Sequence, residues 1–332
     1  MKKCCLVFIF FFLAFTDAWA THNRAGQITY KFIGQLTPNP VWTFRITITT
    51  FTKTSSYQAD RPSLDTVYLG DTQTPEQFLR DTFIDLPNDI RKNTYTKDHT
   101  YNGNGSYLIH FTDPNRNANV NNIPNSVAVP FYLETLLIIN PFVGANNSIQ
   151  TKYDPIDQGC INRIYVHNPF AFDIDGDSLS YQLVECKGVN GSPIVGYTYP
   201  SASNSFTLDQ DGYLTWDSPM QTGEYNVAFL IIEWRNGHMM GYVTRDMQIL
   251  IGNCDNYPPV INVITDTCVL AGKTLNFNVF AYDPIDHNKV VLSETGAFSI
   301  HLSFPIRLHS LTALSIKILS FQNSAGMCNV IM

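Results

Sequence analysis

The clearest pattern along the chain is a strict alternation of apolar and polar side chains. In residues 41–51, VWTFRITITTF, Trp42 and Phe44 begin a row of apolar residues that alternate with threonines and an arginine. A period of two residues is typical of a half-buried β-strand. Two further strands are expected at residues 107–111 and 127–139. The N-terminal part of the chain therefore reads as one β-rich domain.

Strand patterns continue in a second unit, residues 150–253. Residues 179–184 read as a strand, and residues 206–216 read as a hairpin around an Asp-Gly turn pair. Residues 225–234, YNVAFLIIEW, begin by alternating and then become continuously apolar, as a central sandwich strand does. We therefore expect two β domains, at residues 21–148 and 150–253, with no convincing amphipathic helix.

An internal repeat indicates the architecture. Residues 168–173, NPFAFD, match residues 278–283, NVFAYD, at four of six positions, with an offset of 110 residues. That spacing suits tandem immunoglobulin-like sandwiches of about 100 residues each. The predicted fold class is all-β, with tandem sandwiches.

The predicted third sandwich, residues 260–296, offers too few strands to close. Residues 297–332 contain no Asp or Glu and form an atypical tail. We interpret this tail as the product of a shifted or truncated reading frame; a genuine divergent C-terminus is the alternative.

The segment of residues 113–124, DPNRNANVNNIP, carries five asparagines between two predicted strands. Asparagine tolerates left-handed backbone and forms local side-chain turns, so this segment is expected to be a loop. It is either a recognition or cation-binding loop, or simply turn chemistry.

The first residues read as an export signal. Lys2 and Lys3 precede an apolar run at residues 5–15, and Ala-Trp-Ala at residues 18–20 is a typical cleavage site. The apolar run is too short to span a bilayer, so residues 1–20 are expected to be a signal peptide rather than an uncleaved anchor. We therefore expect a secreted or cell-surface protein without a membrane span after cleavage.

Composition narrows the function further. The formal net charge is -7 and charged residues make up 15% of the chain. Nucleic-acid binding requires a clustered basic surface, so that class of partner is not expected.

Export makes the cysteines informative, because disulfides persist outside the cytosol. Cys160, Cys186, Cys254 and Cys268 allow three connectivities. We favour the pairs Cys160–Cys186 and Cys254–Cys268, since the members of each pair are close in sequence. The spacings do not fit a zinc site, whose ligands come in close pairs.

The strongest candidate site is an acidic turn. Asp173, Asp175 and Asp177 alternate within five residues. Closely spaced carboxylates supply the hard oxygen ligands that Ca²⁺ prefers, and Asp209 or Asp211 would complete the set. The alternative is a solvated turn before a strand, because Asp-Gly is a common turn pair.

Catalytic motifs are not found in the sequence, which contains neither HExxH nor GxSxG. Glu185 and Glu233 lie on candidate strands and are the candidates for the two carboxylates of a glycosidase. Nothing in their spacing supports such a pair. Trp42, Trp216 and Trp234 are candidates for a sugar platform or for core packing. We therefore expect a protein that is not an enzyme.

Five motifs occur in order along the chain: THNRAGQITY at 21–30, FTDPNRNA at 111–118, PFYLET at 130–135, DIDGDSLSY at 173–181 and EWRNG at 233–237. Together they resemble the N-terminal part of gliding-motility-associated, secreted multidomain surface proteins of Bacteroidetes, which usually end in a type IX secretion sorting domain. The second unit also resembles a dystroglycan-type cadherin-like domain.

The resemblance covers about residues 21–296 and implies an exported cell-surface or extracellular multidomain protein, without implying a reaction. From the residues and the resemblance together we expect a non-enzymatic structural or adhesion protein, whose sandwiches calcium would stiffen. Its partner would be a surface polysaccharide or a protein. The alternative function is a carbohydrate-binding accessory module of a secreted polysaccharide-degrading system.

Overall fold

The computed structural model describes the chain with some gaps. The described residues are 23–36, 41–56, 59–255, 257, 259–262, 266–269, 274–285, 287, 289–290, 311–319 and 328–331. Helical structure within them is limited to short 3-10 turns such as η2 (Ser126–Ala128) and η3 (Val189–Gly191). The predicted all-β fold of tandem sandwiches is confirmed.

The chain divides into two compact units, Met1–Asn253 and Cys254–Met332. The finer division of the first unit, at residues 148 to 150, stays a prediction. The expected signal peptide, residues 1–20, lies outside the described residues.

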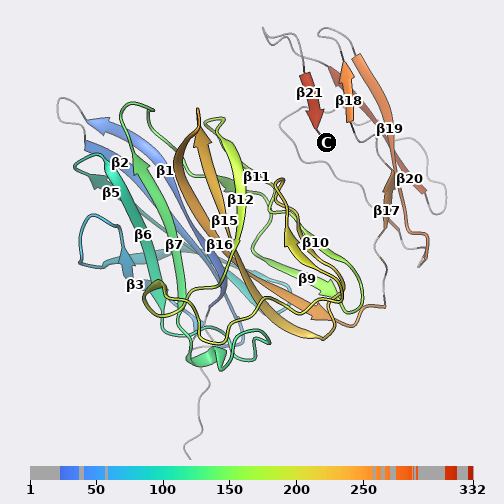
Figure 1. The fold of residues 1–332 in the computed structure, drawn as a ribbon, viewed down its shortest axis with the longest axis horizontal. Coiled ribbons are helices and arrows are strands. Elements are labelled where there is room, and N and C mark those ends of the chain that lie inside the picture. The colour runs from blue at the N-terminus through green and yellow to red at the C-terminus, as the bar shows by residue number, and fades with distance from the viewer. Residues whose placement is uncertain are drawn as a thin grey trace, which may run out of the picture. The chain divides into compact units, whose positions relative to one another are not determined.

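One long sheet of eleven strands organises the first unit. Its strands are β1 (Asn23–Leu36), β2 (Val41–Thr52), β3 (Ser63–Tyr68), β4 (Glu76–Leu86), β5 (Ile90–Tyr101), β6 (Gly105–Asp113), β7 (Phe131–Ile139), β9 (Ile156–Cys160), β12 (Ser178–Val184), β15 (Gly223–Arg235) and β16 (His238–Gly252). The path runs β1-β2-β5-β4-β3-β6-β7-β16-β15-β12, and β9 pairs in parallel with β16 (Figure 1).

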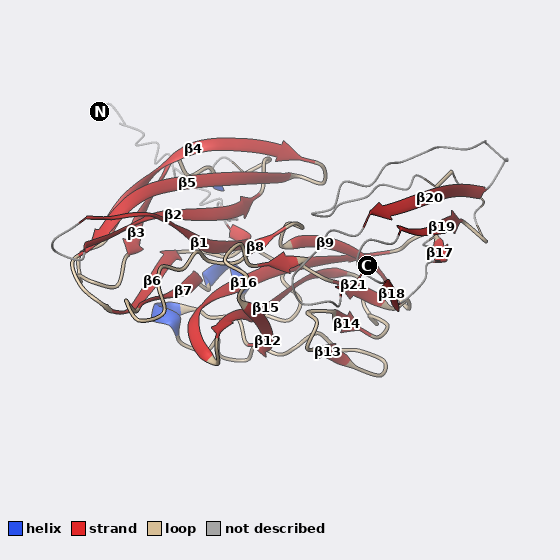
Figure 2. Cartoon of the chain, turned by 90° about the horizontal axis from the view of Figure 1, so that it is seen from above, coloured by secondary structure: helices blue, strands red, loops and turns tan. Residues whose placement is uncertain are grey.

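The sheet folds back on itself, because β1 also pairs with β16 at Gly26 and Asp246. The layer of β2, β5 and β4 then lies over β6 and β7 (Figure 2). The alternation predicted for β2 is confirmed, since Trp42, Phe44 and Ile46 are all buried. These side chains join a core that also contains Phe111 from β6 and Leu133, Leu137 and Ile139 from β7.

A second core lies between the other end of the long sheet and a smaller sheet. The smaller sheet contains β10 (Tyr165–His167), β13 (Phe206–Leu208) and β14 (Leu214–Trp216), while β8 (Gln150–Thr151) pairs with β11 (Ala171–Phe172). Trp216 from the small sheet packs with Phe229 and Val243 from β15 and β16. Strand β16 lines this second core and pairs with β7 and β1, which line the first core, so that hydrogen bonding along the sheet joins the two halves of the unit.

The predicted hairpin at 206–216 is formed by β13 and β14, with Leu208 opposite Leu214. Gly212 has a φ of +83° in its turn, and a Cβ there would lie 2.7 Å from the ring of Tyr181. Both the backbone conformation and the close approach require glycine at this position.

The second unit contains β17 (Val260–Asn262), β18 (Asp266–Val269), β19 (Thr274–Tyr282), β20 (Leu311–Leu319) and β21 (Cys328–Ile331). The last two strands come from the atypical tail. Strand β20 pairs along the whole of β19, and β21 pairs with β18, so the tail supplies partner strands. Whether residues 297–332 derive from a shifted frame stays a prediction.

The cysteines correct one expectation. Cys160 is disulfide-bonded, whereas Cys186 is a free, buried thiol, so the predicted pair Cys160–Cys186 is wrong. Closeness in sequence was misleading because β15 and β16 separate β12 from β9 in the sheet. Cys254 is also disulfide-bonded. The side chain of Cys268 lies outside the described residues, so the pair Cys254–Cys268 stays a prediction.

Candidate functional site

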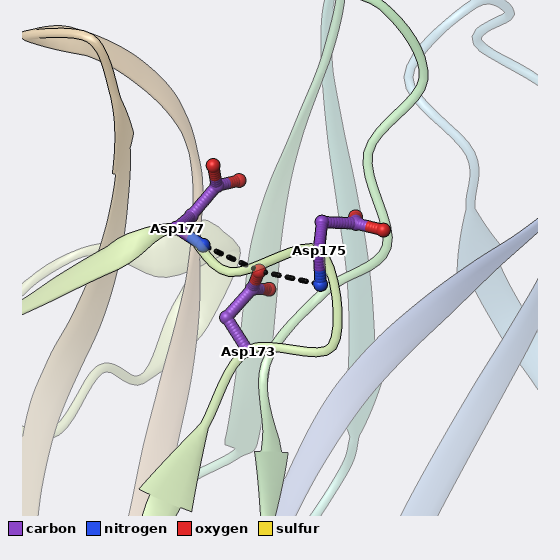
Figure 3. A group of neighbouring side chains, drawn as sticks. All are labelled: Asp173, Asp175 and Asp177. Atoms are coloured by element: carbon purple, nitrogen blue, oxygen red, sulfur yellow. Dashed lines mark hydrogen bonds between the residues drawn. The ribbon is translucent and has the colours of Figure 1, made fainter. Parts of the chain in front are cut away.

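The acidic turn between β11 and β12 gathers three carboxylates. The candidate ligand oxygens of Asp173, Asp175 and Asp177 all lie within 4.8 Å of one another. Asp173 accepts the backbone N–H groups of Asp175 and Asp177, each at 2.9 Å, which fixes the turn (Figure 3). Its second oxygen, Oδ2, is buried without a hydrogen-bond partner among the described residues. Burial and the neighbouring negative charges raise the pKa of Asp173.

Arg235 supplies a cation to this turn. Its Nε and Nη2 donate to the two oxygens of Asp177 at 2.7 and 2.8 Å, and Nη2 lies 3.5 Å from Asp175 Oδ2. The bidentate geometry is the strong form of an Arg–carboxylate pair. Arg235 therefore offsets much of the repulsion that suggested a metal ion.

The same guanidinium holds a second loop. Arg235 donates to the backbone oxygens of Val143 and Ala145, and to Asn146 Oδ1 at 3.0 Å. Asn147 donates from its backbone and its side chain to Asp175. The loop after β7 and the acidic turn are thus tied together at the junction of the two sandwich cores.

Glu233 lies behind this junction and is fully buried. Its Oε2 accepts from Asn146 Nδ2 at 2.9 Å and from the Tyr30 hydroxyl at 3.4 Å, while Oε1 has no partner among the described residues. Burial, with a smaller effect of the Asp173 charge, raises the pKa of Glu233 to about 8. Glu233 is therefore mostly protonated at neutral pH.

Asp209 and Asp211 do not join the acidic turn in the structure. They lie in the hairpin between β13 and β14, where Asp209 accepts the backbone N–H groups of Asp211 and Tyr213. Among the described residues, the metal-type grouping at the turn comprises the other three aspartates alone. Asp209 and Asp211 have a turn-forming role.

The repeat copy shares the turn in its described residues. Asp283 accepts the backbone N–H of Ile285 at 3.2 Å, as Asp173 does for Asp175. The two other oxygen donors of that copy, Asp286 and Asn288, lie outside the described residues.

The candidate glycosidase pair is not assembled. Glu185 follows the end of β12, where Val184 lies opposite Ala228, and Glu233 lies five residues farther along β15. At about 3.3 Å per residue, that separation is roughly 16 Å or more, beyond the range of either glycosidase geometry.

The tryptophans divide into two groups. Trp42 and Trp216 are buried in the two cores, which favours the packing interpretation over a sugar platform. Trp234 is different, because it is half-buried on the opposite side of β15 and donates to Ser180 Oγ at 2.8 Å.

The Asn-rich segment has a structural role that sequence reasoning missed. Arg116 is fully buried and forms two hydrogen bonds with Asp246 of β16, at 3.1 and 2.6 Å. Asn122 exchanges hydrogen bonds with the backbone of Asn226 on β15. The loop of residues 113–124 therefore packs against the long sheet through buried polar contacts, and we call it the polar plug.

The plug also binds the first strand. Arg24 donates to Gln248 Oε1 at 2.6 Å and to Glu224 at 2.7 Å, and Gln248 donates to Asn117 at 2.9 Å. Two motifs that define the family resemblance, THNRAG and DPNRNA, thus meet in one buried network. The signal available in the sequence was an arginine in each of the two motifs, Arg24 and Arg116.

Among the described residues, no helix has the length and apolar character needed to cross a membrane.

Comparison with known proteins gives a distant likeness. No protein-family model and no curated protein matches the chain. The tandem Ig repeats of Dlar match with 8% identity and a TM-score of 0.22, covering 68% of this chain and 99% of that one. The N-terminal Ig1-2 module of the Drosophila receptor protein tyrosine phosphatase DLAR matches with 9% identity and a TM-score of 0.23, covering 67% and 98%.

The first eight Ig domains of the Down syndrome cell adhesion molecule match with 8% identity and a TM-score of 0.18. That match covers 93% of this chain and 36% of the other.

Proposed function

We propose that the chain is an exported, non-enzymatic structural or adhesion protein, whose tandem sandwiches display a binding surface outside the cell. The observation that carries the proposal is the pairing of β16, which lines the second core, with β7, which lines the first. Together with the buried Arg116–Asp246 pair, this pairing makes a stiff double module. The disulfide-bonded Cys160 and Cys254 and the signal-like residues 1–20 are in keeping with export. The motif resemblance favours the secreted surface proteins of Bacteroidetes.

Export is tested by locating the full chain in its native cells. An antibody raised against residues 21–253 is expected to detect the protein in the medium or on intact cells, where added protease removes it. A cytoplasmic enzyme measured in the same samples controls for lysis. Full-length protein that remains protected inside intact cells, with residues 1–20 still attached, would contradict the proposal.

We also propose that the acidic turn takes Ca²⁺ weakly. Asp173 Oδ2 is an oxygen without a described partner, which favours a cation, while Arg235 competes for Asp175 and Asp177. Affinity of such sites follows the net ligand charge. Replacing Arg235 with Gln is therefore expected to strengthen Ca²⁺ binding by roughly tenfold, as measured by calorimetric titration.

Asp217→Asn, which changes an aspartate in another loop, is the matched control and should leave the titration unchanged. Asp175→Asn should weaken it. Absence of heat in the wild type and in Arg235→Gln, together with equal melting temperatures in Ca²⁺ and in chelator, would remove calcium from the proposed function.

A further inference from the structure

The face of the long sheet that turns away from both cores is covered at one end by a cluster that includes Ala228 and Cys186, and beyond that cluster it differs from an ordinary solvent-facing surface. On β7, β16 and β15, Leu136, Tyr242, Leu230, Ile232 and Trp234 point away from both cores and are half-buried. These strands and their neighbours β6 and β12 lie side by side (Figure 1). An antiparallel sheet with one solvated face normally carries polar residues on it. We call this surface the outer face.

The outer face has a fixed aromatic anchor. Trp234 reaches the neighbouring strand and donates from Nε1 to Ser180 Oγ at 2.8 Å. Its own hydrogen-bonding group is thereby satisfied, so what remains for a ligand is the apolar ring. Aromatic rings of this kind bury large areas at low entropic cost.

A cavity of about 50 Å³ opens beside this surface. Its walls include Tyr132, Val184, Ala228 and Leu230, and Thr244 contributes a hydroxyl. Thr244 is 6% exposed, and its Oγ1 has no hydrogen-bond partner among the described residues. A buried hydroxyl without a partner is costly unless a ligand or water satisfies it. The cavity is therefore built to receive a group that can form a hydrogen bond.

The charges around the cavity are largely satisfied within the protein. Lys187 Nζ lies 2.6 Å from Glu134, which also accepts from the Tyr242 hydroxyl at 2.9 Å. Asp246 is paired with Arg116. Glu185, at the exposed rim, is the charged lining residue without an ion pair among the described residues. A ligand that enters passes Glu185 at the rim and then meets an apolar wall, a neutral hydroxyl and an aromatic neighbour.

We propose that the outer face binds a neutral polysaccharide, with a pendant hydroxyl-bearing group of one sugar inserted beside Thr244 and the chain lying across Trp234. The chemistry matches, because sugars combine apolar faces with hydroxyl donors and acceptors. This inference rests on the proposed function and names the partner class of the displayed surface.

The test is retention of the full exported chain on a panel of neutral polysaccharides, namely cellulose, curdlan and mannan. The wild type is expected to bind at least one of them. Thr244→Val, which keeps the side-chain shape, should weaken binding on the order of tenfold, and Trp234→Ala should weaken it at least as much. Tyr213→Ala, at an exposed aromatic residue on the β13–β14 hairpin, is the control and should bind normally.

Melting curves establish that each variant is folded, and Thr244→Val keeps the test valid if Trp234→Ala is unstable. The inference is overturned if the wild type binds none of the three polymers, if it binds anionic alginate alone, or if Thr244→Val binds as well as the wild type. Each of these outcomes leaves export intact, so the failure of this inference is distinguishable from the failure of the proposed function.

Discussion

Replacing Arg116 with Met is expected to lower the free energy of unfolding by about 3–5 kcal/mol, measured by urea denaturation at pH 7. Arg116 is fully buried, donates twice to Asp246 and once to the backbone oxygen of Lys187, and lies 4.8 Å from the centre of the Phe131 ring. Methionine fills much of the volume but leaves the buried Asp246 carboxylate without its cation. The loss arises from that uncompensated charge.

The exposed pair of Arg45 and Asp98 provides a matched control. It has similar geometry, with contacts of 2.7 and 2.9 Å, but its side chains are 51% and 45% exposed. Arg45→Met should therefore cost only a small fraction of the loss expected for Arg116→Met. Equal losses in the two variants would show that burial does not govern the Arg116 pair. Adding Asp246→Leu to Arg116→Met should recover part of the stability, because it removes the orphaned charge.

The contrast between these pairs shows what the sequence could predict. The alternation of Trp42, Phe44 and Ile46 predicts strand β2, because the period of two reflects local pleating. The Asp-Gly pair predicts the β13–β14 hairpin for a similarly local reason. Both features depend on residues within a few positions of each other.

The buried network is a different case. Arg116 meets Asp246 across 130 residues, and Arg24 meets Gln248 across 224. Periodicity carries no information about which distant polar residues become partners, so the Asn-rich loop read as turn chemistry. The predicted disulfide of Cys186 was wrong for the same reason, since disulfide pairing depends on the order of the strands in the sheet rather than on spacing in the sequence.

The acidic turn was found because its three carboxylates are close in sequence. The cation that pairs with them, Arg235, comes from a strand and lies 58 residues from Asp177 in the sequence.

The stability of the protein is expected to fall as pH rises from about 5 to 8, and Glu233→Gln is expected to remove much of that fall. Burial raises the pKa of Glu233 from 4.5 to about 8 in the folded protein. Below pH 4.5 both states hold the proton, so the contribution to stability is complete. Between pH 4.5 and 8 the unfolded chain releases the proton while the folded chain retains it. The free energy of unfolding therefore declines by up to about 1.4 kcal/mol per pH unit from this group.

The measurement is urea denaturation of wild type and Glu233→Gln at several pH values between 5 and 9, with the difference between them isolating this group. Glutamine retains an oxygen for Asn146 and Tyr30 but carries no ionisable proton, so its curve should be the flatter one. Glu185→Gln, an exposed change on the same sandwich, should keep the wild-type slope. Parallel curves for wild type and Glu233→Gln would mean that Glu233 is ionised in the folded state. The fully buried carboxylate would then need a cation, and the junction beside the acidic turn would be the place to look for it.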